Sequence, residues 1–117
     1  MELIACVGDD KTAWGQITGL INRGAWDKII LVRTQEGIVY NAPQHAEEVN
    51  IDSKKPVVEL KKDLMLLLKG KLSEFEVCLS IASGTGKEHM ALISALLSIP
   101  VGIRLVAFTK QGVEFIN

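Results

Sequence analysis

The sequence predicts one α/β domain with a mainly parallel central sheet and a C-terminal β-hairpin. Three largely apolar segments, at residues 3–7, 28–33 and 76–82, have the pattern of strands that are buried on both faces. Apolar residues at helical spacing separate the first two strands, which indicates a right-handed parallel βαβ unit. The chain has 117 residues, the size of a single domain, so we expect one hydrophobic core over residues 1–117.

The first half of the chain alternates strand and helix. The strand at 3–7 ends at Gly8-Asp9-Asp10, and the apolar residues from Ala13 to Ile21 predict a helix that stops at Asn22-Arg23-Gly24. After the strand at 28–33 the pattern weakens. Residues 38–40 are compatible with a hairpin return, and residues 43–48 with a short helix that precedes an edge strand at 49–51.

The second half begins with a helix from Val57 to Leu68, which ends at Gly70. The strand at 76–82 then leads into a glycine-containing loop at 83–87 and a helix, up to Ile99, that is apolar nearly all round. This helix is either enclosed by its own domain or part of a subunit interface, most simply that of a symmetric homodimer. Pro100 ends the helix, and residues 103–108 and 113–116 form the terminal hairpin.

Composition excludes several classes of protein. Hydrophobic residues make up 48% of the chain, and 13 basic against 14 acidic residues leave a net charge of −1, which argues against a partner such as duplex nucleic acid. The two cysteines, Cys6 and Cys78, each lie in an apolar strand, and we expect buried free thiols in a reducing cytoplasm. No signal peptide or membrane-spanning segment is expected. His45 and His89 lie 44 positions apart without other ligands at metal-binding spacing, so no metal and no cofactor are predicted.

Two loops have the composition and the position of a binding site. In an open parallel sheet, ligands bind beyond the carboxyl ends of the strands. Gly8-Asp9-Asp10-Lys11-Thr12 follows the first strand, and Ser83-Gly84-Thr85-Gly86-Lys87 follows the strand at 76–82. In the second loop the glycines allow close backbone approach, the helix start offers unpaired N–H groups, and the other three side chains add donors for an anion. The alternative is a tight turn in which Ser83 or Thr85 merely caps the helix.

The common phosphate-binding patterns do not fit the second loop. A Walker loop requires glycine at the position of Ile81 and Ser or Thr at the position of Glu88. The dinucleotide pattern requires a third glycine where His89 stands, and a nucleophile elbow requires glycines at the positions of Ile81 and Thr85. His89, in the first turn of the helix, faces either a ligand in the loop or solvent.

Taken together, these features resemble the CRISPR-associated Rossmann-fold (CARF) domain family, whose members are dimeric sensors of cyclic oligoadenylates. The likeness lies in the loop at 8–12 and, more specifically, in Ser83-Gly84-Thr85-Gly86-Lys87-Glu88-His89-Met90-Ala91. The element order extends it over nearly the whole chain. The resemblance implies a Rossmann-like three-layer fold and a role in type III CRISPR signalling. The chain would then be a free-standing ring nuclease, a protein that only binds the messenger, or an excised sensor domain.

The resemblance also implies roles for individual residues. Two copies would form one two-fold ligand site, with residues 83–87 against phosphates and riboses and residues 9–12 near the adenines or the same backbone. As a metal-independent ring nuclease, the protein would position a ribose 2′-hydroxyl against its neighbouring phosphodiester. Lys87 would then stabilise the phosphate, Ser83, Thr85 or Lys11 would orient it, and His89 would carry a proton. A nucleotide-binding regulatory module of another kind and a structural partner subunit remain as alternatives.

Overall fold

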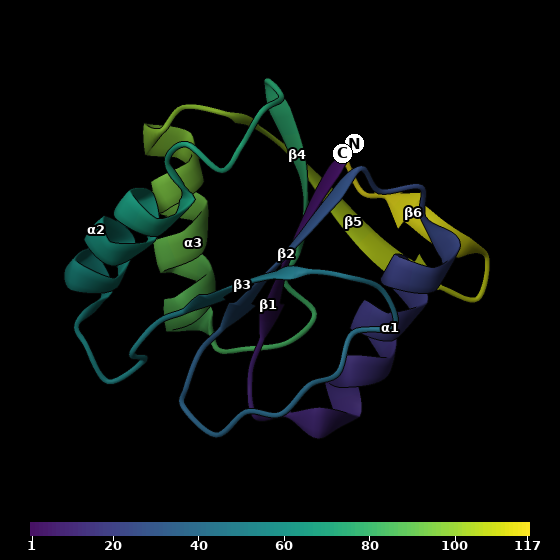
Figure 1. The fold of residues 1–117 in the computed structure, drawn as a ribbon, viewed down its shortest axis with the longest axis horizontal. Helices are drawn as coiled ribbons and strands as arrows, with labels where there is room; N and C mark the ends of the chain where they lie inside the picture. Colours follow the sequence, from purple (N-terminus) through teal and green to yellow (C-terminus); the bar gives the residue numbers. More distant parts are fainter.

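Five of the six strands run parallel, and the last turns back against the fifth. The computed structural model describes residues 1–117 (Figure 1). The strand order is β3-β2-β1-β4-β5-β6. The elements, in chain order, are β1 (Glu2–Val7), a 3₁₀ turn η1 (Lys11–Ala13), α1 (Trp14–Arg23), β2 (Lys28–Arg33), β3 (Glu47–Asn50), α2 (Val57–Leu68), β4 (Glu76–Ser80), α3 (Gly86–Ser98), β5 (Gly102–Thr109) and β6 (Gly112–Phe115).

Helices cover both faces of the sheet and form two hydrophobic layers with it. Side chains alternate along β1, so that Ile4 and Cys6 face α2 and α3, whereas Leu3, Ala5 and Val7 face α1. All of β1 is buried, as the continuous apolar run predicts. Figure 1 shows α2 and α3 together on one side of the sheet and α1 on the other. This is the Rossmann-like three-layer α/β fold with a C-terminal antiparallel hairpin that the sequence predicts.

Most of the expected elements are confirmed within two or three residues at their ends. The strand expected at 76–82 ends at Ser80, and the last helix begins at Gly86. Cys6 and Cys78 are both free and buried. None of the helices is both long enough and apolar enough to cross a lipid bilayer.

The segment between β2 and β3 differs from both sequence interpretations. Residues 38–40 do not form a hairpin strand: Ile38 and Tyr40 are buried against the α1 layer, and their carbonyl oxygens accept hydrogen bonds from the Arg33 guanidinium at 2.7 and 3.3 Å. Residues 43–48 do not form a helix either. Glu47 and Glu48 belong to β3, because the free edge of β2 pairs with them in parallel register. The predicted edge strand is therefore present but begins two residues earlier.

Candidate functional site

The two predicted loops meet where the strand order changes direction. From β1 the chain moves outward through β2 to β3, and it then returns to place β4 on the other side of β1. The loops after β1 and β4 therefore leave neighbouring strands at the carboxyl edge of the sheet. In open α/β sheets this position is the usual ligand site.

A buried serine joins the two loops. The Ser83 hydroxyl has no exposed surface, accepts a hydrogen bond from the Gly8 N–H at 2.8 Å and donates one to Asp10 Oδ1 at 2.5 Å. The same Asp10 oxygen accepts the Gly84 N–H at 3.2 Å. The structure thus brings Gly8, Asp10, Ser83 and Gly84 together, but the Ser83 hydroxyl serves the protein itself.

Close packing between the loops explains two of the three glycines. A Cβ atom on Gly8 would lie 2.8 Å from the Gly84 Cα, which is too close for two backbones. Gly84 has φ +101°, and its Cβ would lie 2.8 Å from the Cys6 sulfur. A Cβ on Gly86, in contrast, would meet nothing within 4 Å. Only at Gly86 is the backbone open to an approaching ligand.

Helix α3 begins with a complete capping box. Thr85 Oγ1 accepts the Glu88 N–H at 3.3 Å, and Glu88 Oε1 accepts the Thr85 N–H at 2.7 Å. Thr85 therefore caps the helix, as one of the two interpretations of this loop expects. Gly86 and Lys87, the next two residues, are exposed, and their N–H groups have no acceptor in the chain, so an anion could bind there.

Negative charge already lies beneath this helix start. Glu88 is buried, and Asp10 lies across the loop. Burial, with smaller contributions from the carboxylates of Glu88 and Asp10, raises the pKa of the Cys6 thiol to about 12. Cys6 is therefore a neutral packing residue, and the interior below the loop is unsuited to a second anion.

Lys87 reaches away from its own loop, whereas the ring of His89 packs against that loop. The Lys87 ammonium donates to the carbonyl oxygens of Ser53 at 2.6 Å and Lys55 at 3.0 Å, so it links α3 to the segment after β3. The ring of His89 is half-buried, and its Nε2–H donates to the Ser83 carbonyl oxygen at 2.7 Å. Neither the lysine nor the histidine contacts the Ser83 hydroxyl.

The remaining residues of the first loop lie toward α1. Asp9, Lys11 and Thr12 are exposed. The Lys11 ammonium lies 6.0 Å from the centre of the Trp14 ring, and the Trp14 indole N–H donates to the Gly8 carbonyl oxygen at 2.9 Å. A small pocket of about 190 Å³ lies between this loop and residues 37–39. No group of three or more His, Cys, Asp or Glu side chains is arranged to hold a metal ion.

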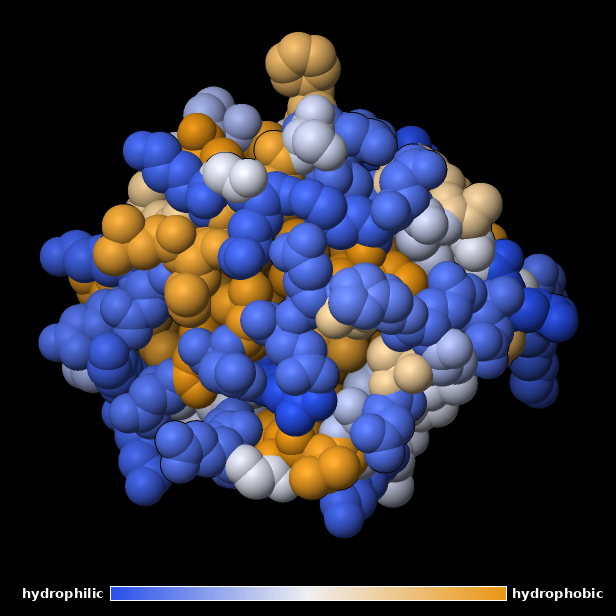
Figure 2. Space-filling model, in the orientation of Figure 1, coloured by the Kyte–Doolittle hydropathy of each residue, from blue (hydrophilic) through white to orange (hydrophobic).

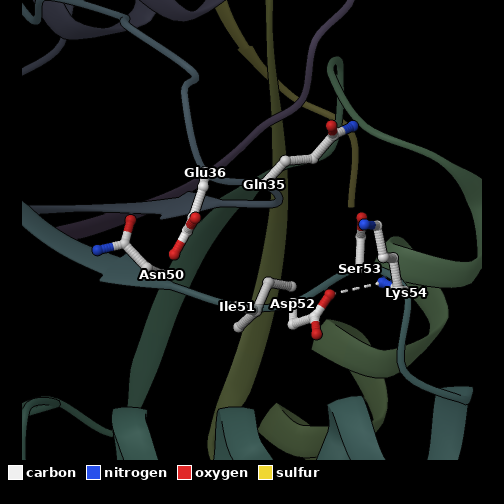
Figure 3. Close-up of a pocket in the computed structure, with 7 residues that line it drawn as sticks. All are labelled: Gln35, Glu36, Asn50, Ile51, Asp52, Ser53 and Lys54. Atoms are coloured by element: carbon white, nitrogen blue, oxygen red, sulfur yellow. Dashed lines mark hydrogen bonds between the residues drawn. The ribbon is translucent and has the colours of Figure 1, made fainter.

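The sequence analysis missed a larger polar pocket next to Lys87. It has a volume of about 510 Å³ and is lined by residues 35–36, which follow β2, and residues 50–54, which begin at the last residue of β3 (Figure 3). The signal that could have found it is the cluster of polar residues after two neighbouring parallel strands. The pattern did not stand out because the edge strand was expected at 49–51, which places Asn50 and Ile51 inside the strand.

Fold and site together define a Rossmann-like α/β domain with a polar carboxyl edge. Comparison with known proteins adds no closer identity: no protein-family model matches the sequence, and no curated protein matches it.

Proposed function

We propose that this protein binds a cyclic oligoadenylate at the carboxyl edge of its sheet, in a site completed by a second copy of the chain. The observation that carries the proposal is the junction of the loops after β1 and β4 at the change of strand direction. Next to this junction lie two free N–H groups at the start of α3 and the ammonium group of Lys87. Together they offer several donors to phosphate groups without a metal ion.

A symmetric pair of chains agrees with the surface of the α2–α3 layer. Met90 and Leu97 on α3 are 64% and 62% exposed, and Leu66 on α2 is 77% exposed. Figure 2 shows apolar surface over α2 in this orientation. A contiguous apolar patch on a small domain is typical of an interaction surface, and two-fold pairing suits a ligand that is itself a symmetric ring. The two free buried thiols suit a protein of the reducing cytoplasm.

The proposed activity is ligand binding, and the residues of the second loop have different roles in it. Lys87 is the residue for phosphate contact. Ser83 is a positioning residue, because its buried hydroxyl is already bonded to the first loop. Cleavage of the ring would need a ribose 2′-hydroxyl held in line with its phosphodiester, and the same assay reveals it as linear product.

The test is binding of cyclic tetra-adenylate and cyclic hexa-adenylate to the purified protein in EDTA. We expect one of the rings to bind and AMP not to bind. Lys87→Ala should weaken ring binding about tenfold, since a charge-assisted contact to phosphate is lost. Lys87→Arg should recover most of the affinity. Lys69→Ala, an exposed lysine at the end of α2, is the matched control and should leave affinity unchanged.

Other outcomes discriminate between the classes of function. If neither ring binds the wild-type protein, the proposal is wrong. Thermal stabilisation by ordinary mononucleotides instead of rings would indicate a nucleotide-binding regulatory module of another kind. Capture of a partner protein that is insensitive to Lys87→Ala, without any nucleotide binding, would indicate a structural subunit.

A further inference from the structure

The pocket beyond β2 and β3 has the dimensions of a small-molecule site. Its volume of about 510 Å³ lies within the range of about 300–1,000 Å³ that is usual for such sites. It opens at the same carboxyl edge as the two loops, one strand further from the centre of the sheet. No residue of this pocket was part of the predicted site.

The side chains of the pocket favour ligand groups that donate hydrogen bonds over ligand groups that carry negative charge. Glu36 and Asp52 take part in no ion pair, and Lys54 is the only cation in the lining, so the formal charge of the lining is negative. Asn50 and Gln35 add amide oxygens and amide N–H groups. In Figure 3 the side chains of Glu36 and Asn50 approach one another on one side of the pocket, opposite Ser53 and Lys54. A phosphate would be repelled here, whereas hydroxyl and amino groups would find acceptors.

One rim of the pocket adjoins the phosphate contact proposed above. Ser53 lines the pocket, and its carbonyl oxygen accepts the Lys87 ammonium at 2.6 Å. An uncharged group in the pocket and a phosphate at Lys87 would therefore be neighbours. A nucleotide has this combination of parts: a nucleoside rich in N–H and O–H donors, joined to a phosphate.

We infer that this pocket holds an adenosine unit of the ligand, with Glu36 and Asn50 accepting hydrogen bonds from its amino group or ribose hydroxyls. The inference rests on the proposed function and specifies where the nucleoside binds. The pocket lining contains no aromatic side chain. Recognition would therefore depend on hydrogen bonds instead of stacking, and loss of a single acceptor should have a measurable effect.

The experiment uses two probes, adenosine without phosphate and cyclic tetra-adenylate. Backbone amide signals are followed by NMR in the wild-type protein and in Glu36→Ala, Asn50→Ala and Glu114→Ala. Glu114 lies on β6 at the opposite end of the sheet and is the matched control. We expect millimolar adenosine to shift the signals of residues 35–36 and 50–54. Glu36→Ala and Asn50→Ala should each weaken both probes about tenfold, and Glu114→Ala should weaken neither.

The outcomes separate this inference from the proposed function. If cyclic tetra-adenylate binds the wild type and the pocket variants equally, the pocket assignment is overturned and the proposed function stands. If adenosine shifts the pocket signals but no ring binds, the pocket is a nucleoside site and the proposed function fails. If adenosine shifts only residues 8–12, or no signals at all, the pocket assignment is overturned.

Discussion

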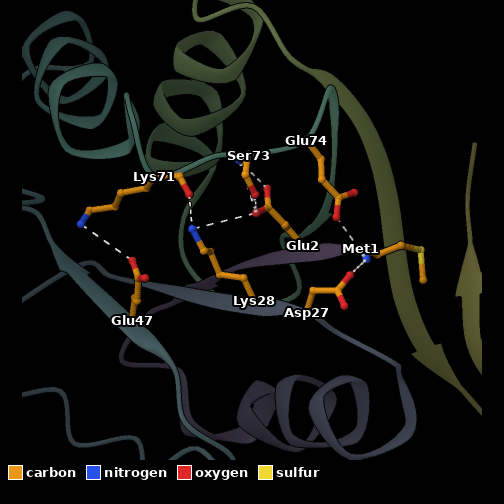
Figure 4. A network of polar contacts seen from close by, with 8 residues as sticks. All are labelled: Met1, Glu2, Asp27, Lys28, Glu47, Lys71, Ser73 and Glu74. Carbon is orange, nitrogen blue, oxygen red and sulfur yellow. Dashed lines mark hydrogen bonds and ion pairs between the residues drawn. The ribbon is translucent and has the colours of Figure 1, made fainter.

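The two ends of the parallel strands differ in which of their carboxylates form ion pairs. At the amino ends, charged groups are paired: Figure 4 shows the Met1 ammonium between Asp27 and Glu74, and Lys71 reaches Glu47 at 3.8 Å. At the carboxyl ends, Arg33 pairs with Glu48 and Lys55 with Asp63, but the carboxylates of Asp9, Glu36 and Asp52 form no ion pair.

Because of this difference, we expect the carboxylates at the amino edge to stabilise the fold and those at the carboxyl edge to bind ligands. Glu2 is buried at the amino edge, where its carboxylate accepts hydrogen bonds from the Ser73 hydroxyl at 2.6 Å and the Ser73 N–H at 3.2 Å. Such a group stabilises the connection between α2 and β4 and is not accessible to a ligand. The unpaired carboxylates of the other edge contribute little to folding and remain available for binding.

The largest expected effect concerns the one part of the carboxyl edge that is closed. Gly84→Ala should destabilise the protein by about 3 kcal/mol, because the positive φ and the Cys6 sulfur both oppose a side chain there. Gly86→Ala, two residues away in open space, should change stability by no more than about 0.5 kcal/mol. Chemical denaturation of the two variants measures the difference. Equal stabilities would show that the loops are not packed against each other as described.

Hydrophobic patterning predicted the centre of this fold because three of its six strands are apolar runs. β1, β2 and β4 are buried on both faces, so their residues alone identify them. β3 has one buried residue, Val49, and is a strand only because β2 has a free edge beside it. Ile38 and Tyr40 are buried by contacts with α1 that no local pattern records.

For the candidate site, the sequence predicted where the two loops lie but not what their side chains contact. The sequence predicts that both loops lie at carboxyl ends of strands, and the change of strand direction brings them together. Whether the Ser83 hydroxyl faces a ligand or the protein depends on Asp10, which lies 73 positions earlier. The sequence alone could not decide between these two orientations of the Ser83 hydroxyl. Nor could it show which glycine is needed for packing, as Gly84 is, and which lies in open space, as Gly86 does.

A smaller effect should follow from removing one carboxylate at each edge. Glu2→Ala should destabilise the protein by about 2 kcal/mol, because it leaves the Ser73 N–H and hydroxyl without their acceptor. Glu36→Ala should remain within about 0.5 kcal/mol of the wild type, since the exposed Glu36 side chain has no partner in the chain. Urea unfolding of both variants provides the measurement. If Glu36→Ala lowers the free energy of unfolding as much as Glu2→Ala does, the two edges do not differ in the way described.

The smallest expected effect is a pH dependence at the amino edge. A hydrogen bond to Asp27 raises the pKa of the Met1 ammonium above its ordinary value of 8.0, and the charges of Asp27 and Glu74 add to this. A raised pKa in the folded state means that the contribution is complete below about pH 8 and is lost as pH rises through the raised pKa. The wild type should therefore lose part of its advantage in melting temperature over Asp27→Asn between pH 7 and pH 9.5. Because the pair is exposed, 1 M salt should reduce the same advantage at pH 7. An advantage that is independent of both pH and salt would mean that Asp27 acts through packing, and the charge pairing that distinguishes this edge would then contribute nothing at Met1.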